Sequence, residues 1–209
     1  MNDSILILGN GGHAKIASEI ISKNSYFKNI HYLDDSKEKT NFVQDSLLGE
    51  LSLAFDNEIC RKFKNAFVAI GNSQIRVQII NKLIKYGYNI PTLIHPTSCI
   101  AENSKIDYGC LINANVVVQP NVSVSYGSIL NTSSTVDHDC KIGSGVHICP
   151  GVNIAGNVNV GNNAFIGIGS SVINNINIGE NVMIGAGSVV INDLHDNARV
   201  YGNPAKSKL

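Results

Sequence analysis

The fold is decided by residues 141–190, which read KIGSGVHICP GVNIAGNVNV GNNAFIGIGS SVINNINIGE NVMIGAGSVV. An aliphatic residue occurs at every sixth position of this stretch, from Ile142 to Val190. The same step leads back to Ile100 without an exception, which makes sixteen consecutive hexapeptides. The position four residues after each aliphatic one is small or aliphatic, from Ser104 to Ser188. A strict period of this length indicates a repeat architecture, not a sandwich of short strands.

Each hexapeptide supplies one short strand and one corner, and three of them complete a triangular coil. The aliphatic and the small residue point inward and stack on their equivalents one coil away, while the corners need tight or left-handed backbone geometry, which Gly and Asn tolerate. The expected corner residues are Gly109, Asn115, Asn121, Gly127, Gly145, Gly151, Asn157, Asn163, Asn175, Asn181 and Gly187. The sequence therefore predicts an all-β left-handed parallel β-helix of about five coils over residues 96–192, followed by a C-terminal tail at 193–209.

Residues 1–95 have a different pattern. Short apolar runs at 4–8, 31–33 and 67–70 predict strands, and helical spacing follows at 14–22 and from Ser73, a possible helix cap, to about Tyr86. Strands that alternate with helices are typical of a parallel sheet. We therefore expect an α/β domain with a small parallel sheet, about half of a dinucleotide-binding fold.

The first strand runs into a glycine-rich turn. Residues 9–14, GNGGHA, fit the pattern G-x-G-x-x-G/A, and Asp34 and Asp35 follow about twenty positions later. Such a turn lets a ligand approach the backbone, and the start of a helix favours an anion. We interpret the turn as a nucleotide or nucleotide-sugar site; NAD binding and a purely structural turn are the alternatives. The two aspartates would suit ligand hydroxyls or base N–H groups, or form a solvated turn.

The composition argues against several partners. The chain has 209 residues with 16 Lys+Arg and 16 Asp+Glu, so a neutral surface gives no electrostatic reason to bind nucleic acid or a membrane surface. The first apolar run is too short for a signal peptide or a membrane span. The five cysteines include no C-x-x-C pair, so we expect reduced thiols in a cytoplasmic protein.

The repeat region contains two histidines, His138 and His147. His138 falls at a corner between Asp137 and Asp139, and a carboxylate beside an imidazole suits a general base near neutral pH. His147 falls at an outward strand position, and neither histidine is expected in the core. A surface histidine without a role is the alternative for His138.

The spacing of these histidines suggests an assembly. Nine residues are half of an eighteen-residue coil, so the two side chains of one chain are not expected to face one pocket. They could converge across a subunit boundary, and we predict a homotrimer with active sites between subunits. A metal site is not expected, because it would need at least three converging imidazoles.

The chain resembles the nucleotide-linked 4-amino-sugar N-acetyltransferases of bacterial glycan synthesis, of the PglD-like bacillosamine type; the NeuD-like sialic-acid O-acetyltransferases are more distant. The resemblance covers nearly the whole chain. The motifs that carry it are Gly11-Gly12-His13, Asp34-Asp35, Ala69-Ile70-Gly71-Asn72, Asn131-Thr132-Ser133-Ser134 with His138 and Cys140, Ala155-Gly156-Asn157, and Gly202-Asn203-Pro204-Ala205-Lys206.

The resemblance implies acetyl-CoA as co-substrate and a role for each motif. His138 would be the base and Asp139, where the family usually has glutamate, its support. His147 and the Gly156 amide would stabilise the acetyl carbonyl, and Ile168 and Ala186 would line the coenzyme A channel. The residues implied to hold the nucleotide sugar are Gly11, Gly12, His13, Asp34, Asp35 and Gly71, with Asn131 near the sugar.

Two other functions are compatible with these residues. A sugar or sialic acid O-acetyltransferase would use the same fold and histidine, and a non-catalytic partner of a biosynthetic enzyme would not need the His138–Asp139 pair. The sequence does not distinguish UDP from dTDP, or define the C2 group and stereochemistry of the sugar.

Overall fold

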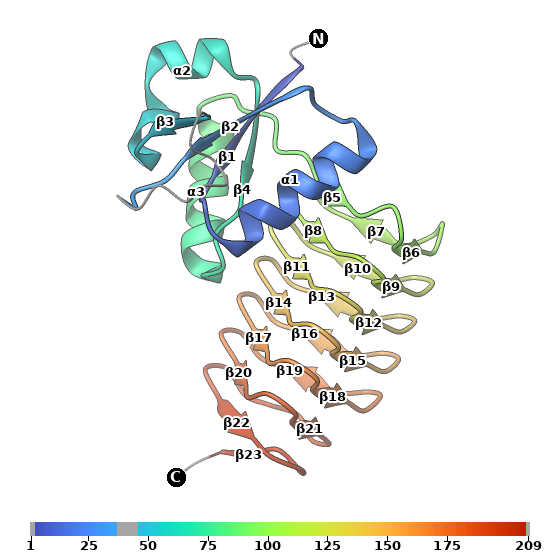
Figure 1. Cartoon of the computed structure of the whole chain (residues 1–209). Helices are drawn as coiled ribbons and strands as arrows, with labels where there is room; N and C mark the ends of the chain where they lie inside the picture. Colours follow the sequence, from blue (N-terminus) through green and yellow to red (C-terminus); the bar gives the residue numbers. More distant parts are fainter. Residues whose placement is uncertain (1–2, 37–45, 208–209) are drawn as a thin grey trace. The chain divides into compact units, whose positions relative to one another are not determined.

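The computed structural model describes residues 3–36 and 46–207, in two compact units, Met1–Leu93 and Ile94–Leu209 (Figure 1). The division falls two residues before the boundary at residue 95 that the sequence suggests. Each unit has its own core and is described separately.

The N-terminal unit is built on a parallel sheet with strand order β3-β2-β1-β4. Its strands are β1 (Ser4–Leu8), β2 (Asn29–Leu33), β3 (Leu47–Gly49) and β4 (Asn65–Val68). The expected strands are present, although β4 ends two residues earlier than predicted. The prediction of three strands was wrong, because β3 is only three residues long and has no alternating pattern by which to recognise it.

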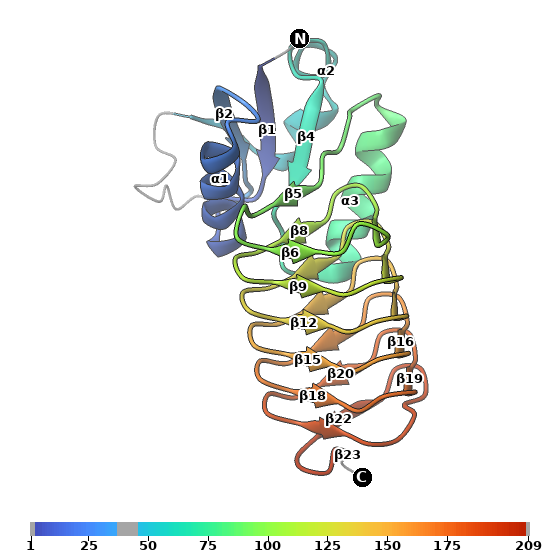
Figure 2. The same ribbon diagram turned by 90° about the vertical axis from the view of Figure 1, so that its right-hand side faces the viewer.

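Three helices and a 3-10 turn accompany this sheet: α1 (Gly12–Asn24), η1 (Leu51–Phe55), α2 (Asn57–Lys62) and α3 (Ser73–Lys85). Figure 2 shows α1 and α3 on opposite sides of the sheet. The cap of α3 is Asn72 and not Ser73, since the Asn72 side chain accepts a hydrogen bond from the Ile75 amide at 3.0 Å. No helix of the described residues is long and apolar enough to cross a membrane.

The C-terminal unit is a left-handed parallel β-helix in which each of the sixteen hexapeptides forms one two-residue strand (Figure 2). One face holds β6 (Cys99–Ile100), β9 (Val117–Val118), β12 (Thr135–Val136), β15 (Asn153–Ile154), β18 (Ser171–Val172) and β21 (Val189–Val190). The second holds β7 (Lys105–Ile106), β10 (Ser123–Val124), β13 (Lys141–Ile142), β16 (Asn159–Val160) and β19 (Asn177–Ile178). The third includes β8 (Leu111–Ile112), β11 (Ile129–Leu130), β14 (His147–Ile148), β17 (Phe165–Ile166) and β20 (Met183–Ile184).

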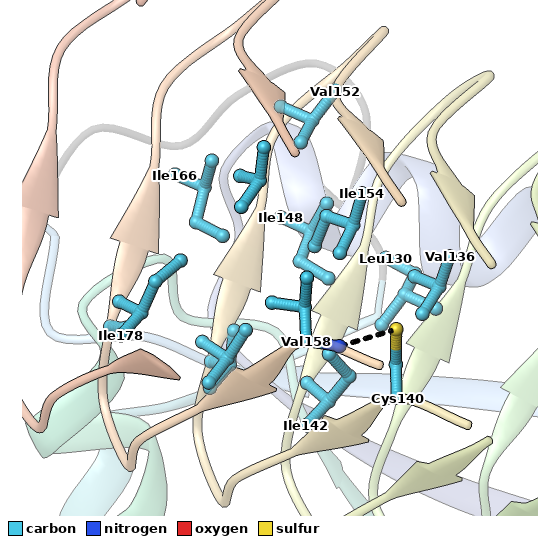
Figure 3. Packing of buried hydrophobic residues seen from close by; sticks show 14 of the residues in the cluster. Leu130, Val136, Cys140, Ile142, Ile148, Val152, Ile154, Val158, Ile166 and Ile178 are labelled. Carbon is cyan, nitrogen blue, oxygen red and sulfur yellow. Dashed lines mark hydrogen bonds between the residues drawn. The ribbon is translucent and has the colours of Figure 1, made fainter. Parts of the chain in front are cut away.

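The predicted period sets the register of these sheets. Leu130 pairs with Ile148 and Ile148 with Ile166, so each residue meets its equivalent one coil away. From Ile112 onward every aliphatic hexapeptide residue is buried; Ile100 and Ile106, in the first coil, are partly buried. Figure 3 shows the resulting stack of side chains. The cost of fixing so many short strands is offset by this continuous apolar column.

The corners confirm the predicted backbone geometry. All eleven of the Gly and Asn residues predicted at corners have positive φ. Ser133, Asp139 and Gly169 also have positive φ at corners, which the sequence analysis did not predict. Aspartate tolerates this conformation better than most residues, so Asp139 can occupy its corner at φ 60°.

The stack extends beyond the sixteen hexapeptides at both ends. At its start, β5 (Leu93–Ile94) joins the third face beside β8. In the segment interpreted as a tail, Leu194 bridges to Ile178, β22 (Arg199–Tyr201) pairs in parallel with β20, and β23 (Lys206–Ser207) turns back along β22. This coil was overlooked because β20 and β22 pair at a spacing of sixteen residues instead of eighteen. Residues 208 and 209 lie outside the described range.

Replacing Ser134 by alanine is expected to raise the free energy of unfolding by about 1 kcal/mol. Ser134 is fully buried, and its Oγ has no hydrogen-bond partner in the described structure. The matched control is Ser128→Ala. Ser128 is equally buried, but its hydroxyl donates to the Gly143 carbonyl at 2.8 Å and accepts from the Val146 amide at 3.1 Å. Ser128→Ala should lower the free energy of unfolding. Denaturant unfolding of both variants tests whether the two changes in this free energy have opposite signs.

Candidate active site

The glycine-rich turn joins β1 to α1 at the carboxyl ends of the parallel strands. Gly9 has φ 110°, and a Cβ there would lie 2.8 Å from the Ala69 carbonyl oxygen, so only glycine fits. Gly11 and Gly12 have open space where a Cβ would point, and α1 begins without a side-chain cap or an acidic residue in its first turn. Such a helix start offers backbone N–H groups and a positive dipole end to an anion.

His13 lies beside the loop that follows β4. A Cβ on Gly71 would be 3.4 Å from His13 Nε2, so the ring lies against this glycine. Arg76 on α3 is 1% exposed and donates from Nη1 to the carbonyls of Ile70 and Gly71, at 2.8 and 2.9 Å. Burial, and then the Arg76 charge, hold the pKa of His13 below its ordinary value, so its imidazole is neutral near pH 7.

This cluster lies at the boundary between β1 and β4. The chain proceeds from β1 to β2 and β3 on one side and returns to β4 on the other. The crevice at such a reversal is the usual ligand site of open parallel sheets. His13 and Gly71, which the sequence analysis selected separately, therefore belong to one place in the N-terminal unit.

The aspartates after β2 have structural partners. Asp34 Oδ1 accepts from the Ser36 amide at 2.6 Å, and Asp35 Oδ1 accepts from the Leu51 amide at 2.9 Å. Both side chains thus shape the loop at the end of β2. They remain at the carboxyl edge of the sheet, as the turn after this strand predicts.

His138 lies in the corner between β12 and β13, with its side chain 58% exposed. Its Nδ1 is 2.8 Å from Asp139 Oδ2. Because the carboxylate only accepts hydrogen bonds, Nδ1 carries the proton and Nε2 keeps its lone pair. The hydrogen bond to Asp139 and the charge of Asp137 raise the pKa of His138. The arrangement is that of an oriented base, and the aspartate reaches the ring despite being shorter than glutamate.

Gly156 makes room for this ring. It occupies the position of His138 one coil further on, and a Cβ there would lie 2.6 Å from Cε1 and 2.7 Å from Nε2 of His138. Any other residue would displace the imidazole, so the structure joins His138, Asp139 and Gly156 into one group.

His147 lies on β14 and, as expected, is not part of the core, but it is only 7% exposed, a burial that the sequence did not predict. Its position does point out of the coil, but the paired residues of the adjacent coils are Ile129 and Phe165. The Phe165 ring meets the imidazole edge-on at 5.2 Å. Apolar neighbours above and below therefore bury a side chain that the repeat places outward.

Asn131 lies beside His147 and forms a second group of site residues with it. Its Oδ1 accepts from the Thr132 amide at 2.9 Å and from Asn113 Nδ2 at 2.6 Å. These donors define the orientation of the amide, which leaves Nδ2 directed at His147 Nε2, 3.5 Å away. Asn131 and His147, to which the resemblance assigns different roles, are thus in contact.

Ile168 and Ala186 form a third group. They occupy equivalent positions of successive coils, and the Gly187 amide donates to the Ile168 carbonyl at 2.8 Å. Ile168 is 56% exposed and Ala186 is also exposed, so both could contact a ligand along this corner. His138 and His147 lie on different sides of the coil, as their nine-residue spacing predicts.

The sequence analysis assigned no functional role to three residues of these groups: Arg76, Asn113 and Asn121. Asn121 was predicted only as a corner, and its Nδ2 donates to Asp139 Oδ1 at 2.9 Å. The two asparagines could have been found, because Asn113 precedes Asn131 and Asn121 precedes Asp139 by eighteen residues, or one coil. Arg76 looks like an ordinary polar residue of an amphipathic helix and gave no such signal. In the part of the chain that is described, no group of three His, Cys, Asp or Glu side chains could hold a metal ion.

Known proteins are similar to this chain in both of its units. Residues 4–83 match the PglD N-terminal domain family. The curated UDP-N-acetylbacillosamine N-acetyltransferase of Bacillus subtilis (strain 168) is 30% identical over 113 residues, which span 53% of this chain and about half, 51%, of that relative.

Solved structures extend the similarity over the whole chain. The acetyltransferase domain of PglB from Neisseria gonorrhoeae FA1090, in complex with acetyl coenzyme A, is 34% identical with a TM-score of 0.93 and 100% coverage of both chains. PerB from Caulobacter crescentus, in complex with CoA and GDP-perosamine, is 30% identical with a TM-score of 0.92, covering 98% of this chain and 97% of that one. The chain therefore belongs to the PglD-like family of hexapeptide-repeat sugar acetyltransferases.

Proposed function

We propose that the protein transfers acetyl from acetyl-CoA to the 4-amino group of a nucleotide-linked 4-amino-4,6-dideoxysugar, for the synthesis of a bacterial glycan. The observation that carries this proposal is the His138–Asp139 pair, which leaves Nε2 of an exposed imidazole with a free lone pair at a corner made open by Gly156. The relatives described above are acetyltransferases, two of which are named for bacillosamine and perosamine chemistry.

The chemistry needs a base but no covalent enzyme intermediate. A 4-ammonium group must lose a proton before its nitrogen can attack the thioester carbonyl, and His138 accepts that proton at Nε2. The imidazole passes this proton to solvent. As the C–N bond forms and the C–S bond breaks, Nε2 accepts a second proton from the attacking nitrogen and gives it to the departing CoA thiolate. The amide of Gly156 and the His147 side chain would stabilise the oxyanion, a contribution of roughly 3 kcal/mol for one donor in other enzymes.

The remaining residues bind the two substrates. Gly11, Gly12, His13 and Gly71 would hold the nucleotide, whose phosphates suit the open start of α1, and Asp34 and Asp35 would bind its hydroxyl or base N–H groups. Asn131 would contact the sugar. Ile168 and Ala186 would line the coenzyme A channel, together with His147 and Gly156. The five free cysteines suit a reducing cytoplasm, where we place the reaction.

The direct test is a screen of acceptors with acetyl-CoA, following the release of free thiol. UDP- and dTDP-linked 4-amino-4,6-dideoxysugars are the first acceptors, and GDP-linked ones are added because PerB was solved with GDP-perosamine. Matched sugars with a 4-hydroxyl test O-acetylation. Turnover with the amines supports the proposal. Turnover with the hydroxyls alone would make the protein an O-acetyltransferase, and none with any acceptor would favour a non-catalytic partner.

His13→Ala is expected to raise KM for the sugar nucleotide and to leave KM for acetyl-CoA nearly unchanged. The reason is that His13 lies in the glycine-rich crevice of the N-terminal unit, whereas the coenzyme residues belong to the β-helix. Asp35→Ala should behave in the same way. Initial rates with each substrate varied in turn measure both constants. If KM for acetyl-CoA rose instead, the glycine-rich turn would be the coenzyme site.

We further propose a homotrimer whose active sites each take His138 from one chain and His147 from the next, since the two lie on different sides of one coil. Mixing inactive His138→Ala with inactive His147→Ala chains, under conditions of subunit exchange, should restore part of the activity, because some boundaries then hold both histidines. A monomer by light scattering, or no recovery after proven exchange, would contradict the shared site and leave the transferase proposal standing.

A further inference from the structure

A short column of side-chain amides leads to the carboxylate of Asp139. Asn103, Asn121 and Asp139 occupy equivalent corner positions of three successive coils, eighteen residues apart. Asn103 Nδ2 donates to Asn121 Oδ1 at 2.6 Å, and Asn121 Nδ2 donates to Asp139 Oδ1 at 2.9 Å. The column therefore connects two coils of the β-helix to the group that holds His138.

The direction of these hydrogen bonds is determined by the last acceptor. An ionised carboxylate cannot donate, so Asn121 must turn its NH2 group toward Asp139. Its carbonyl oxygen then faces the preceding coil, where the Asn103 amide donates to it. The orientation of Asn121 is thus fixed from both ends, and Asn121 presents a donor, never an acceptor, to the carboxylate.

The two oxygens of Asp139 have separate partners. Oδ1 accepts from Asn121, and Oδ2 is 2.8 Å from His138 Nδ1. Asp139 is half exposed, so without a second partner its side chain could rotate away from the imidazole. The hydrogen bonds from His138 and then from Asn121 both lower the pKa of the Asp139 carboxyl, which keeps it ionised. Groups that orient a functional side chain in this way commonly affect activity without touching substrate.

We propose that Asn121 is a positioning residue of the active site: it holds the Asp139 carboxylate in the rotamer that fixes the tautomer and orientation of His138. This rests on the proposed role of His138 as the base. The charged groups that act on His138 are Asp137 and Asp139, both of its own corner. The equivalent positions of the adjoining coils are Pro120 and Gly156, neither of which titrates.

The test is Asn121→Gly, followed by NMR titration of the His138 imidazole in the whole protein without substrate. Glycine accepts the φ of 63° at this position, so the backbone is retained while the donor is lost. The hydrogen bond to Asp139 raises the pKa of His138, so a loosened Asp139 should lower it. The acid limb of kcat/KM should move to lower pH by the same amount, and kcat should fall about tenfold.

Two controls separate positioning from a structural effect. Asn175→Gly changes an asparagine at the equivalent corner position two coils after Asp139, with φ 63° and a hydrogen bond from Asn157 at 2.8 Å, but without contact to Asp139. Asn175→Gly should lose as much thermal stability as Asn121→Gly and leave the pKa of His138 unchanged. In an Asp139→Gly background, Asn121→Gly should cause no further shift, because the effect passes through the carboxylate.

These experiments distinguish failure of the positioning role of Asn121 from failure of the proposed function. An unchanged His138 pKa in Asn121→Gly, or an equal shift in the Asp139→Gly background, overturns the positioning role. A shifted pKa supports it even if His138→Ala retains activity, in which case the role of His138 as base fails instead.

Discussion

His138→Ala is expected to lower kcat by about 10²–10⁴-fold, the usual contribution of a general base. The loss should appear at every pH above the acid limb of the wild type, because the other titratable groups of the corner are carboxylates, which are weaker bases than an imidazole. Thermal unfolding should hardly change, since the side chain is 58% exposed and forms its hydrogen bond with the neighbouring Asp139. Steady-state kinetics and a melting curve of the same preparation measure both quantities.

The wild-type pH profile carries a second signature of the same residue. His138 must be neutral to accept a proton, and Asp139 and Asp137 raise its pKa above the ordinary value of about 6.5. The acid limb of kcat/KM should therefore lie above that value, with the rate rising as pH increases through it. Asp139→Asn should shift the limb to lower pH and cost less activity than His138→Ala. A limb that persists unchanged in His138→Ala would assign the base to another residue.

Gly156→Ala is expected to lower activity about 10²-fold, the effect of a misplacement of about 1 Å at a reacting group. The new Cβ would lie 2.6 Å from the imidazole of His138, so the ring must move. The ring is an exposed side chain and can move at little cost in stability, so the melting temperature should remain near that of the wild type. Gly156→Ala thus measures the effect of displacing the His138 imidazole, whereas His138→Ala measures the effect of removing it.

Two further variants test whether the loss passes through His138. In the His138→Ala background, Gly156→Ala should cause little additional loss, because the displaced ring is already absent. Asn174→Ala, one coil further along the same corner, should keep its activity. A full additional loss in the double variant would mean that Gly156 acts through the acetyl group or the coenzyme and not through the base.

The repeat makes the β-helix predictable in unusual detail. A residue such as Ile148 meets its equivalents one coil away, so the identity of its neighbours follows from counting. The same holds for corners such as Asn157, where positive φ admits few residue types. In the N-terminal unit the glycine-rich turn and the strand before it were equally clear, since Gly9 is required where the turn meets the Ala69 carbonyl.

The candidate site was predicted residue by residue but not as groups. The sequence indicated His138 and its acidic neighbours, because an imidazole between carboxylates is visible in the order of residues. It did not indicate that Asp139 reaches the ring, that Gly156 accommodates it, or that Asn131 contacts His147. These contacts depend on rotamers and on the neighbouring coil.

The sequence by itself determined the left-handed β-helix, its eighteen-residue coils, its corners and its core, because a strict period leaves one way to bury the aliphatic residues. It also determined the parallel sheet and the glycine-rich turn of the N-terminal unit. Only the tertiary structure decided the fourth strand β3, the burial of His147 between Ile129 and Phe165, and the column from Asn103 to Asp139. Periodicity gives the direction of a side chain, whereas its burial and partners depend on the side chains that the fold brings beside it.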